Sequence, residues 1–154
     1  MTVERIPVSI STDCSRIDGR HVGYSAGLEF RKKLRFPIVD MVVQTIEPRE
    51  ARECRYHPSD RGKVEILLPI MGDALLEWHE SHNSHIRGQE TMKGIFDEPF
   101  MFIVNPGTCH RVTATTDFLM LSLNNVPYAK DLDARDCTHG FCLGNRRTHD
   151  DSSP

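Results

Sequence analysis

Short runs of hydrophobic residues, separated by turn-forming residues, set the pattern of the chain from residue 38 onward. These runs are IVDMVVQTIEP, VEILLPIM, DALLEWH, FMFIV, HRVTAT and DFLMLSLNN. They are rich in β-branched and aromatic residues, and Pro, Gly, Asp and Asn lie between them, as is typical of β-strands and their turns. In the last run, strict alternation places Phe118, Met120 and Ser122 on one face of the predicted strand.

The pattern predicts an all-β protein. No long amphipathic segments alternate with the runs, as the helices of a parallel α/β sheet would. Several short strands in one domain favour a sandwich or barrel, which we place at residues 36–128. Residues 1–35 are mixed in character and predict an irregular N-terminal arm with edge strands. Residues 129–154 are polar and predict a C-terminal extension that is partly disordered.

Composition narrows the functional class. The 154 residues suit one domain, and the net charge of -3, with only two short basic clusters, argues against a nucleic-acid partner. No apolar run is long enough to span a membrane, and the N-terminus lacks the features of a secretion signal. Five irregularly spaced cysteines favour reduced thiols, so we expect a cytoplasmic protein.

Two segments carry the candidate chemistry: YHPSDRGKVEILLPIMG (56–72) and FMFIVNPGTCHRV (100–112). In the first, Glu65 is followed by six residues and then Gly72. In the second, a predicted strand is followed by Pro106, Gly107, two residues and His110. These features resemble the two motifs of the cupin superfamily, and the resemblance covers roughly residues 38–124. It implies a single-domain jelly-roll β-barrel that acts on or binds a small molecule.

The first motif departs from the family pattern. The family usually places two histidines shortly before the Glu, whereas this chain has PSDR (58–61) in that window, and its only histidine there is His57. The asparagine that often follows the second-motif histidine is replaced by Ala114. A family-type site with four metal ligands is therefore not expected from the motifs alone.

Glu65 places the strongest physical constraint on the site. Alternation puts Glu65, Leu67 and Pro69 on one face of their strand. If that face is the barrel interior, the carboxylate needs a cation, a hydrogen-bond partner or a proton. His110, which comes from another strand, can be that partner directly or through a metal. The alternative is a solvent-facing Glu65 on a half-exposed strand.

His57, Glu65 and His110 together form the candidate metal site. Two imidazoles and one carboxylate suit a divalent transition metal, Fe(II), Mn, Ni or Zn, with open coordination positions. Asp60 and His79 are weaker candidate ligands that would replace the missing first-motif histidine. In the metal-free alternative, His110 and Glu65 act as base and acid, with Tyr56 as a catalytic or substrate-orienting hydroxyl.

The remaining histidines and cysteines have simpler interpretations. His79, His82 and His85 are predicted at a hairpin tip on the barrel rim, because Asn83 and Ser84 signal a turn. In the tail, Cys137, His139 and Cys142 match no common zinc-site spacing and are predicted to be ordinary tail residues.

Three functions remain open from the sequence. The first is a mononuclear-metal enzyme of the dioxygenase, isomerase or lyase type that acts on a small metabolite. The second is a metal-free epimerase, isomerase or cyclase, and the third is a non-catalytic module that binds a small ligand. We also expect a homodimer, because the edge strands of the N-terminal arm invite pairing.

Overall fold

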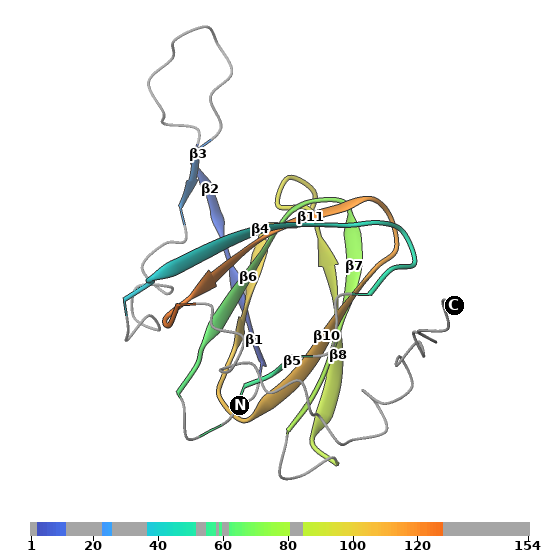
Figure 1. Cartoon of the computed structure of the whole chain (residues 1–154). Helices are drawn as coiled ribbons and strands as arrows, with labels where there is room; N and C mark the ends of the chain where they lie inside the picture. The colour runs from blue at the N-terminus through green and yellow to red at the C-terminus, as the bar shows by residue number, and fades with distance from the viewer. Residues whose placement is uncertain are drawn as a thin grey trace, which may run out of the picture.

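A computed structural model describes residues 3–11, 23–25, 37–51, 55–57, 59, 62–80 and 85–127. Within these residues the chain forms two facing β-sheets (Figure 1). The five-stranded sheet has the order β1 (Val3–Pro7), β9 (Phe100–Val104), β6 (Glu65–Met71), β11 (Phe118–Asn124) and β4 (Asp40–Ile46). The four-stranded sheet has the order β5 (Arg55–Tyr56), β10 (Thr108–Ala114), β7 (Asp73–Glu80) and β8 (Arg87–Lys93). Every pairing in both sheets is antiparallel.

This architecture confirms the predicted all-β, jelly-roll fold class. Each of the six hydrophobic runs contains a strand, and β1 forms an edge strand within the expected N-terminal arm. Two further short strands of the arm, β2 (Ser9–Ser11) and β3 (Gly23–Ser25), form a separate ribbon that projects from the sandwich in Figure 1. The expected extension at 129–154 lies outside the described residues. No helix in the described part of the chain is long and apolar enough to cross a membrane.

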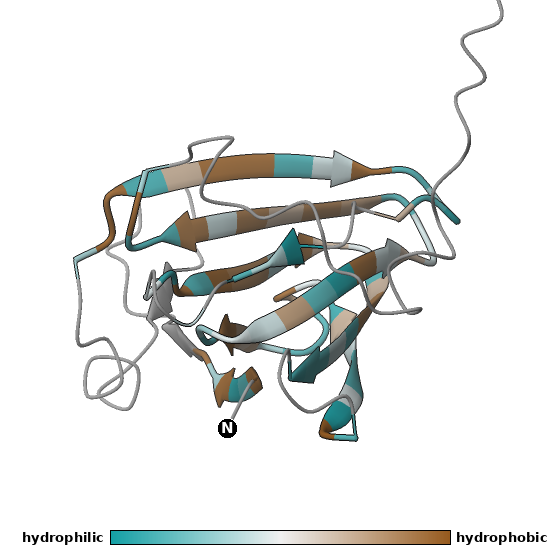
Figure 2. Ribbon diagram, turned by 60° about the horizontal axis from the view of Figure 1, so that its bottom comes forward, coloured by the Kyte–Doolittle hydropathy of each residue, from teal (hydrophilic) through white to brown (hydrophobic). Residues whose placement is uncertain are grey.

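The two sheets enclose an apolar core, because alternate residues of each strand face the space between them. Figure 2 shows this alternation as apolar and polar bands along the strands. Buried residues of both sheets form one cluster: Val3, Ile46, Leu67, Ala74, Leu76, Met92, Phe102, Val104, Val112, Ala114, Phe118 and Met120. A second buried cluster contains Ile6, Ile66 and Ile103, which alternate with that core and lie on the outer face of the five-stranded sheet.

Strand β8 was not predicted from the sequence. Its residues RGQETMK are mostly polar, and Met92 is the only buried side chain among them. The reason is its position: β8 is an edge strand of the four-stranded sheet and has one partner, β7. An edge strand with exposed side chains lacks the apolar alternation that identifies buried strands.

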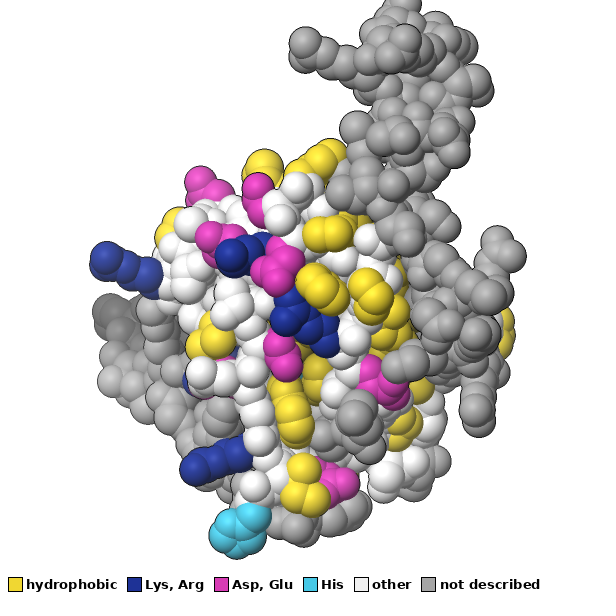
Figure 3. Space-filling model, turned by 180° about the vertical axis from the view of Figure 1, so that it is seen from behind, with side chains coloured by type: hydrophobic (Ala, Val, Ile, Leu, Met, Phe, Trp, Pro, Cys, Tyr) yellow, Lys and Arg dark blue, Asp and Glu magenta, His cyan; other side chains and the backbone are white. Residues whose placement is uncertain are grey.

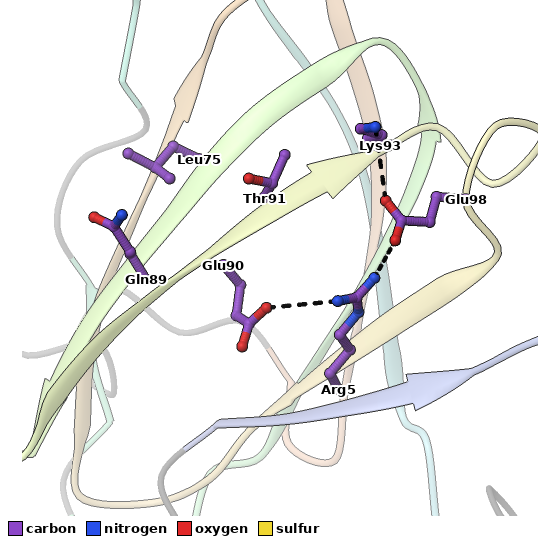
Figure 4. Close-up of a pocket in the computed structure, with 7 residues that line it drawn as sticks. All are labelled: Arg5, Leu75, Gln89, Glu90, Thr91, Lys93 and Glu98. Carbon is purple, nitrogen blue, oxygen red and sulfur yellow. Dashed lines mark hydrogen bonds and ion pairs between the residues drawn. The ribbon is translucent and has the colours of Figure 1, made fainter.

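Ion pairs connect the edges of the two sheets. Arg5 of β1 contacts Glu98 and lies 3.9 Å from Glu90 of β8, and Lys93 lies 4.0 Å from Glu98 (Figure 4). The Arg5 guanidinium also lies 3.7 Å from the centre of the Phe100 ring. Figure 3 shows basic and acidic side chains next to one another near the centre of one molecular face. The charged groups in Figure 4 pair with one another and are partly exposed. We therefore interpret them as contacts that join the edges of the two sheets.

The glycine of the first motif has a steric explanation that can be tested. Gly72, between β6 and β7, has a φ of +81°, and a Cβ there would lie 2.0 Å from the Asp117 carbonyl oxygen. Gly62 also has a positive φ, +61°, but no atom of the described residues lies within 4 Å of its Cβ position. Gly62→Ala should therefore cost about 1 kcal/mol from backbone strain alone. Gly72→Ala should cost about 2–4 kcal/mol, because strain and overlap add.

Urea denaturation of the two variants and the wild type measures this difference in unfolding free energy. Equal losses in the two variants would show that Gly72 is required only for its backbone conformation.

Candidate active site

Three residues from separate parts of the sequence meet in the space between the sheets. Glu65 is the first residue of β6, His110 is the third residue of β10, and His57 directly follows β5. All three side chains have 0% exposed surface. Their ligand-competent atoms all lie within 4.8 Å of one another. The structure thus brings together the three main candidates from the sequence.

The Glu65 carboxylate is the centre of the cluster. Its Oε2 lies 3.2 Å from Nε2 of His57 and 3.2 Å from Nε2 of His110. The two imidazole rings are 5.0 Å apart and nearly perpendicular, with an interplanar angle of 74°. Both histidines therefore point toward the same carboxylate oxygen from different directions. For His57 the distance is that of an ion pair, but the direction does not meet the requirements of a hydrogen bond.

Ser122 holds the other carboxylate oxygen. Its hydroxyl donates a hydrogen bond to Oε1 of Glu65, and both side chains are fully buried. Alternation along the sequence predicts Ser122 on the same strand face as Phe118 and Met120, but it predicts no role for its hydroxyl. A serine among apolar residues on one strand face was the signal that could have identified it, because a buried hydroxyl needs a partner.

The turn of the second motif fixes His57. The His57 backbone N–H donates to the Thr108 carbonyl at 3.0 Å, and the Gly107 N–H donates to the His57 carbonyl at 2.6 Å. Gly107 has a φ of +80°, which glycine adopts without strain. The Pro–Gly turn before His110 therefore also positions the first-motif histidine beside it.

Cross-strand neighbours extend the site on both sheets. Arg55 and Trp78 lie opposite His110 in the register of the four-stranded sheet. Asn124 lies opposite Glu65 in the five-stranded sheet. Directly opposite residues project to the same face of a sheet, so these side chains flank the cluster. None of these three residues could be identified from the sequence, because the register between strands is not visible in a single sequence.

Tyr56 and His79 lie on the other face of the four-stranded sheet. Both are paired in register with Cys109, the neighbour of His110, and adjacent strand residues point to opposite sides. The structure therefore does not bring Tyr56 to the cluster. His79 is buried, with 4% of its surface exposed, and its Nδ1 lies 3.2 Å from the Glu80 carbonyl oxygen. It is not a member of the cluster of candidate metal ligands.

The prediction of a hairpin tip is correct only in part. Strand β7 continues through Glu80, so His79 belongs to the strand and is buried. His85 is exposed in the turn before β8. Asp60, His82 and the tail residues Cys137, His139 and Cys142 lie outside the described residues.

Comparisons with known proteins give matches at the level of structure. No family model matches the sequence, and the search of curated proteins gave no significant match. One similar structure is the 3'-monoepimerase ChmJ from Streptomyces bikiniensis in complex with dTDP-quinovose (TM-score 0.69, 15% identity, covering 86% of this chain and 68% of that one). Another is the TDP-quinovose 3,4-ketoisomerase WlaRB from Campylobacter jejuni (TM-score 0.67, 12% identity, 87% and 92% covered). A third is the rmlC epimerase from Mycobacterium tuberculosis (TM-score 0.70, 11% identity, 86% and 67% covered).

Identities this low establish the fold alone, because one fold hosts many functions. The matches nevertheless agree with the two-sheet topology described above. The chain therefore has the cupin fold, in the jelly-roll form of these epimerases and ketoisomerases.

Proposed function

We propose that the protein is a metal-independent isomerase or epimerase that moves a proton on a small sugar-derived ligand. The observation that carries this proposal is the buried carboxylate of Glu65 between the imidazoles of His57 and His110. The structural neighbours support the ligand class, since they are named as an epimerase and a ketoisomerase of dTDP-linked sugars. We propose a nucleotide-linked keto sugar as the substrate.

The arrangement suits proton transfer at a carbon next to a carbonyl group. A neutral imidazole of His110 would take the proton from that carbon, and the Glu65 carboxylate would stabilise the imidazolium that forms. His57 would donate a proton to the developing enolate oxygen. For an isomerisation, the imidazolium of His110 would deliver its proton to the neighbouring carbon, while the hydroxyl on the first carbon gives its proton to His57 and becomes the new carbonyl. For an epimerisation, the enol would return its proton to His57, water would protonate the same carbon from the other face, and the hydroxide formed would take the proton from His110. Because Tyr56 faces away from the cluster, it has no part in this scheme.

Burial strengthens these interactions. All three groups are shielded from water, so the attraction between the carboxylate and an imidazolium is much stronger than at the surface. Because the cluster is fully buried, a substrate would reach it only if neighbouring side chains moved apart.

The proposal can be tested by solvent exchange. We expect the protein to catalyse deuterium incorporation from D2O next to the carbonyl of TDP-4-keto-6-deoxyglucose, the ligand named for a related ketoisomerase structure. His110→Asn and Glu65→Gln should each slow this exchange by about 10²-fold or more, because they remove the base or its partner. His85→Asn, at an exposed histidine, is the matched control and should have no effect. Exchange no faster than in buffer, or equal rates in the His110 and His85 variants, would refute the proposal.

A metal enzyme is the second candidate, because the donor set fits a metal ion. Three ligand atoms bound to one ion at about 2.1 Å are separated by about 3.0–3.4 Å. Both contacts of Glu65 Oε2 with the histidine Nε2 atoms are 3.2 Å. His57, Glu65 and His110 would hold a divalent transition metal, which would supply a Lewis acid. The hydrogen bond from Ser122 would keep Oε1 oriented while Oε2 acts as the ligand.

Elemental analysis of protein purified without chelators tests the metal. A bound ion should be stoichiometric in the wild type, absent from Glu65→Gln and His110→Ala, and released below about pH 6, since its ligands must be deprotonated. Metal content that is unchanged in the variants or at pH 5 would contradict coordination by this cluster. Proton exchange by protein that contains no metal would favour the first proposal.

A further inference from the structure

Beside the cluster, the indole Nε1 of Trp78 and the amide Oδ1 of Asn124 are buried and have no hydrogen-bond partner among the residues that the structure describes. Asn124 as a whole is 6% exposed. Such atoms are uncommon in folded proteins, because each has lost its hydrogen bond to water without gaining another.

Their positions relate them to the cluster. Trp78 lies directly opposite His110 across β7 and β10, and Asn124 lies directly opposite Glu65 across β11 and β6. Opposed residues share a sheet face, so one of the two polar side chains flanks the cluster on each sheet. The scheme above gives neither residue a role.

Packing keeps both groups in place. A Cβ on Gly88 would lie 2.5 Å from Cζ2 of Trp78, so the indole lies directly against the backbone of β8. The same ring packs on the apolar core. Asn124 is held in register on both sides, by Glu65 of β6 and Asp40 of β4. These restraints fix the position of the indole ring and of the Asn124 backbone.

We propose that Trp78 and Asn124 are ligand-positioning residues that form hydrogen bonds with the hydroxyl groups of a carbohydrate. An indole N–H only donates and an amide oxygen only accepts, so the ligand must offer both an acceptor and a donor. A hydroxyl group supplies both. Different hydroxyls of one sugar ring can therefore bond to Trp78 on one sheet and to Asn124 on the other. This inference rests on the proposed function, because it places the sugar at that site, and it deepens it by assigning recognition of the sugar.

The ligand-free protein provides the first test. The Oδ1 of Asn124 is buried and unsatisfied, and replacing the amide with an apolar side chain of similar size removes this destabilising atom. We expect Asn124→Leu to raise the Tm of the ligand-free protein by about 2–4 °C. The matched control is Asn125→Leu, which should lower the Tm. Asn125 is satisfied: its Oδ1 accepts from the Val64 N–H at 2.8 Å and its Nδ2 donates to the Gly62 carbonyl at 2.9 Å.

Binding provides the second test, with dTDP-glucose and dTDP as probes. Trp78 is the only tryptophan in the chain, so its fluorescence reports binding in the wild type and in Asn124→Leu. The wild type should prefer dTDP-glucose to dTDP, and Asn124→Leu should reduce that preference at least about tenfold while leaving dTDP binding unchanged. Trp78→Phe should do the same, measured by calorimetry.

Each outcome decides a different point. A lower Tm for Asn124→Leu, or an unchanged sugar preference in both variants, would overturn the positioning role. If the wild type binds neither nucleotide, the proposed substrate class fails, and the comparison of Tm values alone decides whether Asn124 is an unsatisfied group.

Discussion

The burial of the Glu65 carboxylate is the constraint on which the site depends. Glu65 has no exposed surface, and the next inward residue of its strand, Leu67, belongs to the apolar core. A charge in such surroundings is strongly unfavourable unless other groups replace its water. Ser122 contacts one oxygen, and His57 and His110 contact the other. Removing any of these partners therefore affects the fold as well as the chemistry.

These partners come from both sheets, so the site forms only when the two sheets pack against each other. Glu65 and Ser122 belong to the five-stranded sheet, whereas His110 belongs to the four-stranded sheet. His57 reaches the cluster through backbone hydrogen bonds to the turn before β10. The contacts of Glu65 with the two histidines thus span the space between the sheets. Ion pairs around Arg5 link the two sheets at their edges by a different, partly exposed set of contacts.

The strands and the centre of the site could both be predicted from the sequence, because both depend on the alternation of buried and exposed positions. Alternation identifies strands with one buried face, and a Glu or His on that face must have a partner. Prediction failed where alternation is weak or absent, as in the polar edge strand β8 and the two-residue strand β5. It also could not assign Tyr56 or His79 to a face relative to His110. That assignment depends on the pairing of both residues with Cys109, and register is a property of the folded sheet.

The central claim is that Glu65 interacts with both histidines at once. NMR spectra of the ¹⁵N-labelled histidine side chains measure this most directly, since imidazole nitrogen shifts report tautomer and hydrogen bonding. The account predicts that Glu65→Gln changes the signals of His57 and His110 together and leaves those of the exposed His85 unchanged. If the signals of His57 and His110 are the same in the wild type and the variant, the carboxylate does not hold the two imidazoles and the account is contradicted.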